Sequence, residues 1–367
     1  MTHQPAPLEK DELIQLGAEF GIGRPSPGSG NMAGWGNRRY AIETPKGHFE
    51  LRLRGIEEEF DLRREIDLLT YLEKHDFPSP RVVLDTHGRS FLERSGQCLV
   101  LLRVPAGSYL EEEQMSLKQI NSAGHGLGQL HMLGRGYKKT IENRYGFDRI
   151  FEMYAGVRRR MPQYFKKIVR TLDEETEYLG NYLETKLPKG IIHGNVHKNC
   201  MIFKTDTLGS IGDLDAACRG KYIYDLATAV NAMCFASGLY SLDRFEALMA
   251  GYESVRTLSL AEWDSFPNEL RFAALRFTVI RLNEFFAAER DEAQRINEDF
   301  GKYFDRLRVL RREKEGGMEG LLMAMATGYD YRKYQRVKGG DEEGEGGGEG
   351  EREREGELEA DVDEDDI

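Results

Sequence analysis

The stretch HGNVHKNCMIFKTDTLGSIGDLD, residues 193–215, is the part of the chain on which the prediction of the fold depends. It begins with seven mostly polar residues, 193–199, which offer imidazole, amide and ammonium groups. Two short apolar segments follow, 201–203 and 210–212, and their spacing predicts a small β-hairpin. Asp213 and Asp215 come directly after it. The stretch therefore predicts a polar loop and two carboxylates at the two ends of one hairpin.

The segments on either side of this stretch have helical periodicity. Pro188 and Gly190 end one helical region, and a short strand at 191–193 leads into the polar loop. The pattern predicts a mostly helical lobe in which the hairpin is embedded. Apolar residues at helical spacing cover 116–133, 150–171 with a continuation to 187, and 224 to about 336.

The first hundred residues have a different pattern, with alternating runs typical of strands. The runs 39–44 and 48–54 are joined by Pro45-Lys46-Gly47, which is typical of a hairpin. The expected fold class is α+β, with an N-terminal β lobe and a mainly helical C-terminal lobe. The other expected elements are a helix over 9–21, a glycine-dense loop over 21–37, a long helix over 60–75, and strands at 81–84 and 98–102.

Charge is distributed unevenly along the 367 residues. The net charge is -12, but residues 341–367 contain fifteen acidic residues and two arginines, so the rest of the chain is close to neutral. We expect an N-terminal nucleotide-binding β lobe over 1–105, a helical lobe over 106–338 and a disordered acidic tail over 339–367. A neutral body gives no electrostatic reason to expect nucleic acid as a partner.

The sequence also predicts a cytoplasmic protein without a membrane partner. No apolar run approaches the roughly 18 residues of a transmembrane helix. The beginning, MTHQPAPLEKDEL, lacks the features of a secretory signal. The four cysteines are isolated in sequence, which suits a reducing compartment.

The polar loop and the residues after it resemble a known family. The loop 193–203 is followed in order by Asp213, Ala217-Cys218, the run Tyr224-Asp225-Leu226-Ala227 and Leu275-Arg276-Phe277. This arrangement resembles the aminoglycoside phosphotransferase and choline kinase superfamily, and within it the type II homoserine kinases. The resemblance covers about residues 10–315 and implies a bilobal, protein-kinase-like fold.

The resemblance implies that ATP with Mg2+ donates its γ-phosphate to a hydroxyl of a small amino-bearing molecule, either homoserine-like or an amino alcohol. Phosphoryl transfer requires the protein mainly to position phosphates, a cation and the acceptor. Arg54 points to the same face of its strand as Arg52, so spacing leaves the two as alternatives for the phosphate-pairing cation. The resemblance places the nucleotide contacts at Gly34, Gly36, Asn37, Arg52 and Glu65.

The resemblance assigns roles to residues of the stretch quoted first, but two of them depart from the family. Asn195 stands where the family has its catalytic aspartate, and an amide is a far weaker base. Cys200 stands where the family has a metal-binding asparagine, and a thiol is a poor ligand for Mg2+. The candidate catalytic residues are His193, Asn195, His197 and Asp225, and the candidate metal ligands are Asp213, Asp215 and Cys200.

Three interpretations of this loop stay open. The protein is a pseudokinase that binds nucleotide or a regulatory partner; or it is an altered enzyme with His197 as the base and Asp213 with Asp215 holding the cation; or Asn195 is an introduced change from aspartate. The third interpretation leaves Cys200 unexplained.

Three further features lie outside the polar loop. We expect His131 to be a core histidine that packs below the loop. Arg276 or Arg281 would either meet a substrate carboxylate or form an ordinary ion pair. The acidic tail would contact a basic surface, formed by Arg158, Arg159, Arg160, Lys166, Lys167 and Arg170 or by Arg306, Arg308, Arg311 and Arg312.

Overall fold

The structure is a computed structural model, and it describes residues 8–32, 38–286 and 300–311. The predicted phosphate-contact residues Gly34, Gly36 and Asn37 lie outside the described residues, and so does the predicted disordered tail.

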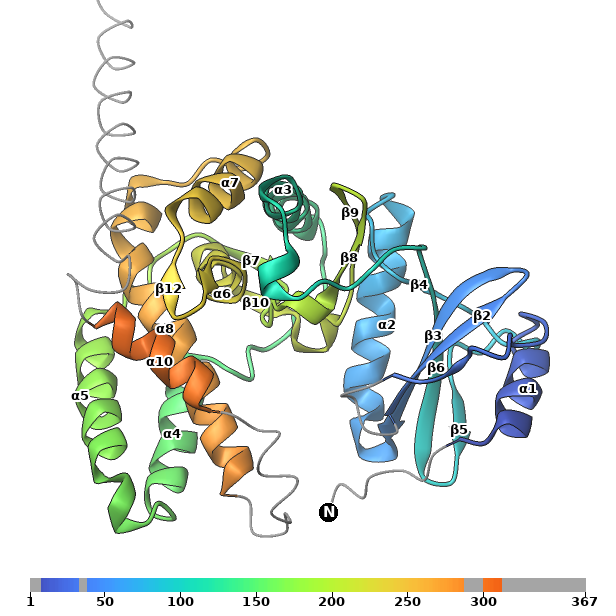
Figure 1. The fold of residues 1–367 in the computed structure, drawn as a ribbon, viewed down its shortest axis with the longest axis horizontal. Helices are drawn as coiled ribbons and strands as arrows, with labels where there is room; N and C mark the ends of the chain where they lie inside the picture. Colours follow the sequence, from blue (N-terminus) through green and yellow to red (C-terminus); the bar gives the residue numbers. More distant parts are fainter. Residues whose placement is uncertain (1–7, 33–37, 287–299, 312–367) are drawn as a thin grey trace, which may run out of the picture.

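The N-terminal lobe is an antiparallel sheet with a helix on each face (Figure 1). The strand order is β1-β2-β3-β6-β4, and β5 pairs with β6. The predicted hairpin is confirmed, with Gly47 at a φ of 130° in its turn. The elements are α1 (Lys10–Glu19), β1 (Gly30–Asn31), β2 (Arg39–Thr44), β3 (Gly47–Gly55), α2 (Glu59–Lys74), β4 (Arg81–Val82), β5 (Leu92–Arg94) and β6 (Gln97–Val104).

The alternation of side chains along β3 determines what each face of the sheet carries. Phe49, Leu51 and Leu53 belong to the apolar cluster shared with α1. The intervening residues of a strand point to the opposite face, so Glu50, Arg52 and Arg54 lie on the side of α2. This single strand therefore supplies an apolar core to one face and a row of charges to the other.

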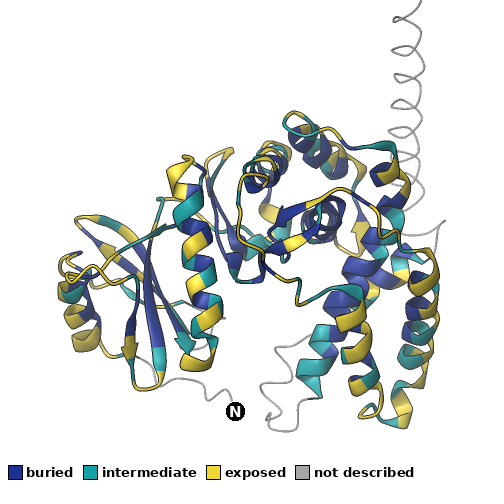
Figure 2. Cartoon of the chain, turned by 180° about the vertical axis from the view of Figure 1, so that it is seen from behind, coloured by how far each residue is buried: buried dark blue, intermediate teal, exposed yellow. Residues whose placement is uncertain are grey.

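The helical lobe is built around α6, whose residues are almost all buried (Figure 2). Helices α3 and α7 pack closely, because a Cβ added at Gly124 would collide with the carbonyl of Leu248 and one at Gly251 with the carbonyl of Asn121. The helices are α3 (Leu117–Gly134), α4 (Phe147–Arg158), α5 (Lys166–Tyr182), α6 (Tyr222–Met233), α7 (Leu242–Glu253), α8 (Leu260–Phe285) and α10 (Gly301–Leu310).

Two short ladders hold the polar loop and the aspartate loop side by side. The predicted hairpin is confirmed as β8 (Met201–Lys204) and β9 (Thr207–Ile211), and β7 (Lys189–Ile192) pairs with β10 (Cys218–Lys221). Ile192 is the ladder partner of Cys218, and Met201 is the partner of Ile211. The loops 193–200 and 212–217 are therefore tied to each other at both of their ends.

Two helical predictions were wrong in extent. The expected helix over 150–171 is two helices, α4 and α5, because Pro162 lies between them and proline cannot supply a helical N–H. The expected helical region from 224 contains a short hairpin, β11 (Phe235–Ala236) and β12 (Leu239–Tyr240). The strand expected over 81–84 is shorter, ending at Val82.

The two lobes meet directly after β6. Ser108 and Phe203 exchange two backbone hydrogen bonds of 3.0 Å, which join the connecting segment to β8. Arg144 of the helical lobe donates to Asp61 of α2 at 2.6 Å. Among the described residues, no helix combines the length and the apolar character needed to cross a membrane.

Candidate functional site

The loop 193–200 is held from below by Asp225 of α6, which is fully buried. Its carboxylate accepts the backbone N–H of His193 at 2.6 Å and that of Gly194 at 2.8 Å. His131 Nε2 donates to the same carboxylate at 3.1 Å. Gly194 has a φ of 74°, and a Cβ there would collide with the carbonyl of Ala216. Glycine at 194 and the carboxylate of Asp225 thus set the shape of the loop together.

A chain of buried polar groups supports Asp225 from behind. His131 Nδ1 lies 2.7 Å from the hydroxyl of Tyr252, which also accepts Arg256 Nη1 at 3.1 Å. Arg256 in turn donates to the buried Glu262 at 2.7 Å. Burial lowers the pKa of His131, so the ring is neutral and its Nε2 proton goes to Asp225. The sequence placed His131 in the core but did not indicate this connection.

Arg276 of α8 supports the loop from the other side. Its Nη1 donates to the carbonyl of Gly194 at 2.5 Å and to the hydroxyl of Tyr224 at 2.6 Å. The side chain is 1% exposed and its guanidinium lies 4.4 Å from the ring centre of Tyr145. Arg281 instead pairs with Glu284 at 2.9 Å. The structure therefore brings Arg276, and not Arg281, to the loop.

His193 links the polar loop to the aspartate loop. Its Nε2 donates to the carbonyl of Gly212 at 2.8 Å, and its Nδ1 accepts the backbone N–H of Asn195 at 3.3 Å. The side chain of Asn195 is left half-buried at the turn of the loop. His193 is thus a structural link within the candidate site.

His197 is neutral and faces Asp213. Its Nδ1 accepts the backbone N–H of Asn199 at 3.2 Å, so the ring proton lies on Nε2. Nε2 is 3.8 Å from Asp213 Oδ2. Burial lowers the pKa of His197 to about 4, against the opposing charge of Asp213. In this tautomer His197 presents a donor, and not a base, to the space beside Asp213.

A cluster of six charged side chains, four of them buried and two half-buried, joins the sheet, α2 and the aspartate loop. We call it the charged cluster, and none of its side chains is more than 12% exposed. It contains three guanidinium groups and three carboxylates. Its members are Arg39, Glu50, Arg52, Arg54, Glu65 and Asp213.

Arg52 is at the centre of the charged cluster. Its Nε donates to Glu50 at 2.6 Å and its Nη1 to Glu65 at 3.3 Å, and its Nη2 forms an ion pair with Asp213 at 2.8 Å. Arg54 reaches the other oxygen of Glu65 at 2.7 Å. Both arginines left open by the spacing of the strand therefore contact Glu65, while Arg52 has the ion pair with Asp213.

Asp213 holds two arginines with one oxygen. Its Oδ1 forms ion pairs with Arg52 Nη2 at 2.8 Å and with Arg39 Nη2 at 2.9 Å. Burial would raise the pKa of Asp213, but the charges of Arg52 and Arg39 outweigh it and keep that pKa well below its usual range. Its Oδ2 is buried and has no hydrogen-bond partner. Arg39 was not among the residues indicated by the sequence.

The residues present do not fit the Mg2+ site that the family resemblance implies. One oxygen of Asp213 is already neutralised twice, and Mg2+ prefers hard oxygen ligands. Cys200 is 2% exposed and its Sγ donates to the carbonyl of His197 at 2.8 Å, within the loop. Asp215 is half-buried, and its backbone carbonyl accepts Arg144. Within the part of the chain that the structure describes, no three His, Cys, Asp or Glu side chains form a group suited to a metal.

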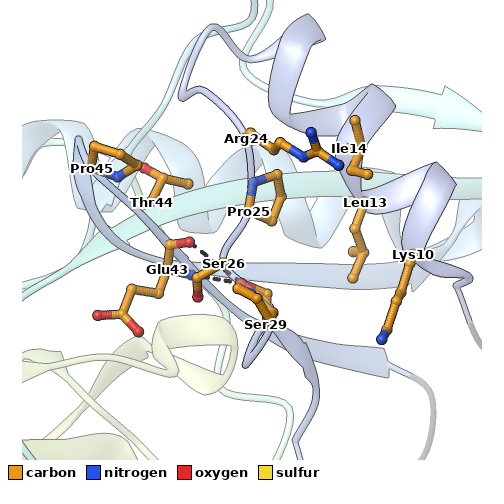
Figure 3. A pocket seen from close by; sticks show the side chains of 11 residues that line it. Lys10, Leu13, Ile14, Arg24, Pro25, Ser26, Ser29, Glu43, Thr44 and Pro45 are labelled. Atoms are coloured by element: carbon orange, nitrogen blue, oxygen red, sulfur yellow. Dashed lines mark hydrogen bonds between the residues drawn. The ribbon is translucent and has the colours of Figure 1, made fainter.

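A cavity of about 750 Å³ lies in another part of the N-terminal lobe. It is bordered by α1, the segment 24–29 and the end of β2, and Figure 3 shows Lys10 and Arg24 at its edge. None of the candidate site residues lines it.

Comparison with known proteins gives one family. The model of the phosphotransferase enzyme family matches residues 29–258. A homoserine kinase of Caulobacter sp. (strain K31) is 31% identical over 282 residues, which cover 76% of this chain and 87% of the relative. A homoserine kinase of Phenylobacterium zucineum (strain HLK1) is 30% identical, with the same coverage of both chains.

Solved structures show the same bilobal kinase-like fold at low identity. An amicoumacin kinase, solved with AMP-PNP, Ca2+ and Ami, superposes with a TM-score of 0.63 at 14% identity, covering 84% of this chain and 95% of that one. A microcompartment-associated aminopropanol kinase has a TM-score of 0.53 at 17% identity, covering 79% and 93%. The predicted fold class is confirmed by these likenesses.

Proposed function

The chain belongs to the phosphotransferase enzyme family, and from this membership we propose that it binds ATP between its lobes and acts on a small amino-bearing hydroxyl compound. The acceptor is homoserine-like or an amino alcohol. In this proposal residues 1–105 hold the nucleotide and residues 106–338 hold the acceptor.

One observation carries the proposal: a buried strand-to-helix ion pair faces a loop that is held rigidly in place. The pair of Arg52 with Glu65 corresponds in kind to the cation and glutamate that kinases use beside the phosphates. Asp225 and Arg276 hold the N–H and the carbonyl of Gly194, which directly precedes Asn195. A protein catalyses phosphoryl transfer mainly by positioning the phosphates and the acceptor hydroxyl.

The acceptor class is supported by the curated relatives, which are homoserine kinases of about 30% identity over most of their length. The likeness to an aminopropanol kinase adds support for the fold alone. An amino group and a hydroxyl on one small molecule are common to both acceptors.

A second candidate function is that of a nucleotide-binding protein with little or no turnover. Asn195 favours it, because its amide can orient a hydroxyl but cannot accept its proton. A general base contributes on the order of 100- to 10,000-fold in rate. His197 does not replace it in the observed tautomer, since its Nε2 carries the proton.

The test has two parts. Thermal unfolding is measured with and without ATP, and ATP consumption is then followed with homoserine, ethanolamine, choline and aminopropanol. The wild type is compared with Asn195→Asp and His197→Ala. We expect ATP to raise the unfolding temperature of all three and turnover to rise about 100-fold or more in Asn195→Asp.

Wild-type turnover that is lost in His197→Ala would instead support an altered enzyme with His197 as base. No effect of ATP on the unfolding temperature of any variant would refute the proposed function.

A further inference from the structure

We propose that the chain binds the phosphates of its nucleotide without a divalent cation, and that Arg39 and Arg52 supply the positive charge beside Asp213. This inference rests on the proposed binding of ATP. It concerns how the site neutralises the nucleotide, and not whether phosphoryl transfer follows.

The register of the hairpin determines which residues of β2 and β3 lie opposite each other. Arg39 and Arg52 are direct partners in the ladder of β2 and β3. Like charges directly opposite each other destabilise a sheet unless anions lie between them. Here Glu50 forms ion pairs with both arginines, at 3.3 Å from Arg39 Nη1 and 2.6 Å from Arg52 Nε. Two guanidinium groups are thus concentrated at the end of β2 that faces the aspartate loop.

Arg39 and Arg52 both reach the aspartate loop. Both form ion pairs with the same oxygen of Asp213, at 2.9 Å and 2.8 Å. A carboxylate at this point would serve a divalent cation by offering it negative charge. Here that charge is already compensated by the protein, because the charged cluster contains three positive and three negative groups. A Mg2+ ion would enter a neutral cluster next to two fixed cations.

Cys200 occupies the second position at which the family resemblance implies a metal ligand. Cys200 offers sulfur, which suits soft metals and not Mg2+. Its Sγ donates to the carbonyl of His197 at 2.8 Å and accepts the His197 backbone N–H at 3.4 Å, so it serves the loop's own hydrogen bonding. Only Asp213 Oδ2 remains, and His197 Nε2 faces it at 3.8 Å.

The guanidinium groups of Arg39 and Arg52 are suited to binding phosphate. A guanidinium is always charged and presents a planar set of N–H donors that matches phosphate oxygens. Arg39 is also the first residue of β2, close in sequence to the glycine-dense stretch that precedes this strand. A nucleotide phosphate that comes within reach of Asp213 therefore meets two arginines first.

The experiment measures ATP and ADP affinity by isothermal titration calorimetry in MgCl2 and in EDTA. We expect the wild-type dissociation constants in the two buffers to agree within about threefold. Arg39→Gln should weaken binding in EDTA by about tenfold or more, since a charge-assisted contact is lost. Arg39→Lys keeps the charge and should recover part of the affinity.

Two further variants complete the design. Arg63→Gln removes an exposed arginine of α2 that pairs with Glu59, so it should leave both affinities unchanged. The double variant Arg39→Gln/Cys200→Asn leaves Asp213 paired with Arg52 alone and restores an oxygen ligand, and it should bind ATP about tenfold more tightly in MgCl2 than in EDTA. Circular dichroism of each unliganded variant checks that it is folded.

The outcomes separate this inference from the proposed function. Wild-type binding that requires Mg2+ overturns the inference but leaves the proposed function intact. Unchanged affinity of Arg39→Gln in EDTA also overturns it. Absence of ATP binding in both buffers overturns the proposed function itself, and the inference with it.

Discussion

At the scale of single residues, Asp213 shows how strongly context decides the charge of a group. Its backbone is left-handed, with a φ of 59°, which aspartate and asparagine tolerate better than most residues. Its carboxylate is buried and remains ionised because two arginines share one of its oxygens. A change to asparagine keeps the backbone preference and removes only the charge.

We therefore predict that Asp213→Asn destabilises the protein by about 3 to 5 kcal/mol, because two buried arginines lose a shared anion. Urea unfolding followed by circular dichroism measures the change. The control is Glu152→Gln, which removes an exposed ion pair with Arg149 and should be nearly neutral. Equal effects of the two variants would contradict the prediction.

His131 makes a prediction about pH. Burial lowers its pKa in the folded protein, so above about pH 6.5 the ring is neutral in both the folded and the unfolded chain. As the pH falls below that value, the unfolded chain binds a proton that the folded chain does not, and stability is lost down to the lowered pKa.

The expected result is that His131→Gln, whose side chain does not titrate, loses less stability between pH 7 and pH 5 than the wild type does. The unfolding temperature at each pH gives the comparison. The same pH dependence in both proteins would show that His131 is not responsible.

At the scale of elements, the close packing of α3 on α7 depends on glycine. A Cβ at Gly124 would meet the backbone carbonyl of Leu248, which cannot move aside as a flexible side chain could. Gly156 in α4 is the opposite case, since an added Cβ has nothing within 4 Å. The same substitution should therefore have opposite signs at the two positions.

We predict that Gly124→Ala destabilises the protein by about 1 to 3 kcal/mol through overpacking. Gly156→Ala should stabilise it by about 0.5 to 1 kcal/mol, because alanine has the higher helix propensity. Denaturant midpoints at constant slope test both. A loss of stability in Gly156→Ala would refute the explanation.

The hairpins and long helices could be predicted because their signals are local. The Pro45-Lys46-Gly47 turn predicts β2 and β3, and the periodicity from residue 60 predicts α2. The pairing of β7 with β10 could not be predicted, because residues 189–192 and 218–221 are far apart in sequence and each is only four residues long. Short strands acquire their partners from the tertiary fold.

The candidate site was predictable to a similar degree. Asp213, Asp225 and Arg52 lie in motifs, and the structure brings the first and third into contact. Arg39 was missed although a signal existed, because the register set by the hairpin turn places it opposite Arg52. Arg276 had no signal for its role, since a helical arginine is usually exposed and only the packed structure buries it against the loop.

At the scale of the whole molecule, the lobes are joined by charge as well as by the chain. Arg52 and Arg39 of the sheet pair with Asp213 of the helical lobe. Arg144 of the helical lobe pairs with Asp61 of α2 in the N-terminal lobe. Buried ion pairs of this kind depend on geometry and are costly to separate. The two lobes are therefore expected to unfold as one cooperative unit.

The predicted acidic tail also concerns the molecule as a whole, because it would contact a basic surface of the body. Five of the ten basic residues considered for it are paired with acidic side chains within the described part of the chain. Arg158 pairs with Asp173, Arg170 with Glu174 and Arg306 with Glu112. Docking of the tail, which the sequence suggested, is untested, and these ion pairs argue against it.

Because of these pairs we expect a chain ending at Gly340 to show the ATP affinity of the full chain at both low and high salt. Calorimetry on the two proteins tests it. A difference that disappears as salt is added would show that the tail binds the body after all.

The ladders at both ends of the loops 193–200 and 212–217 have a consequence for how such a protein changes over time. The path of the backbone is set by the ladder partners, by Asp225, by Arg276 and by the buried thiol of Cys200, and not by the half-buried side chain at 195. Replacing the side chain at 195 therefore costs the fold little. Selection for a stable protein alone does not preserve a carboxylate at this position, and a single substitution can supply one.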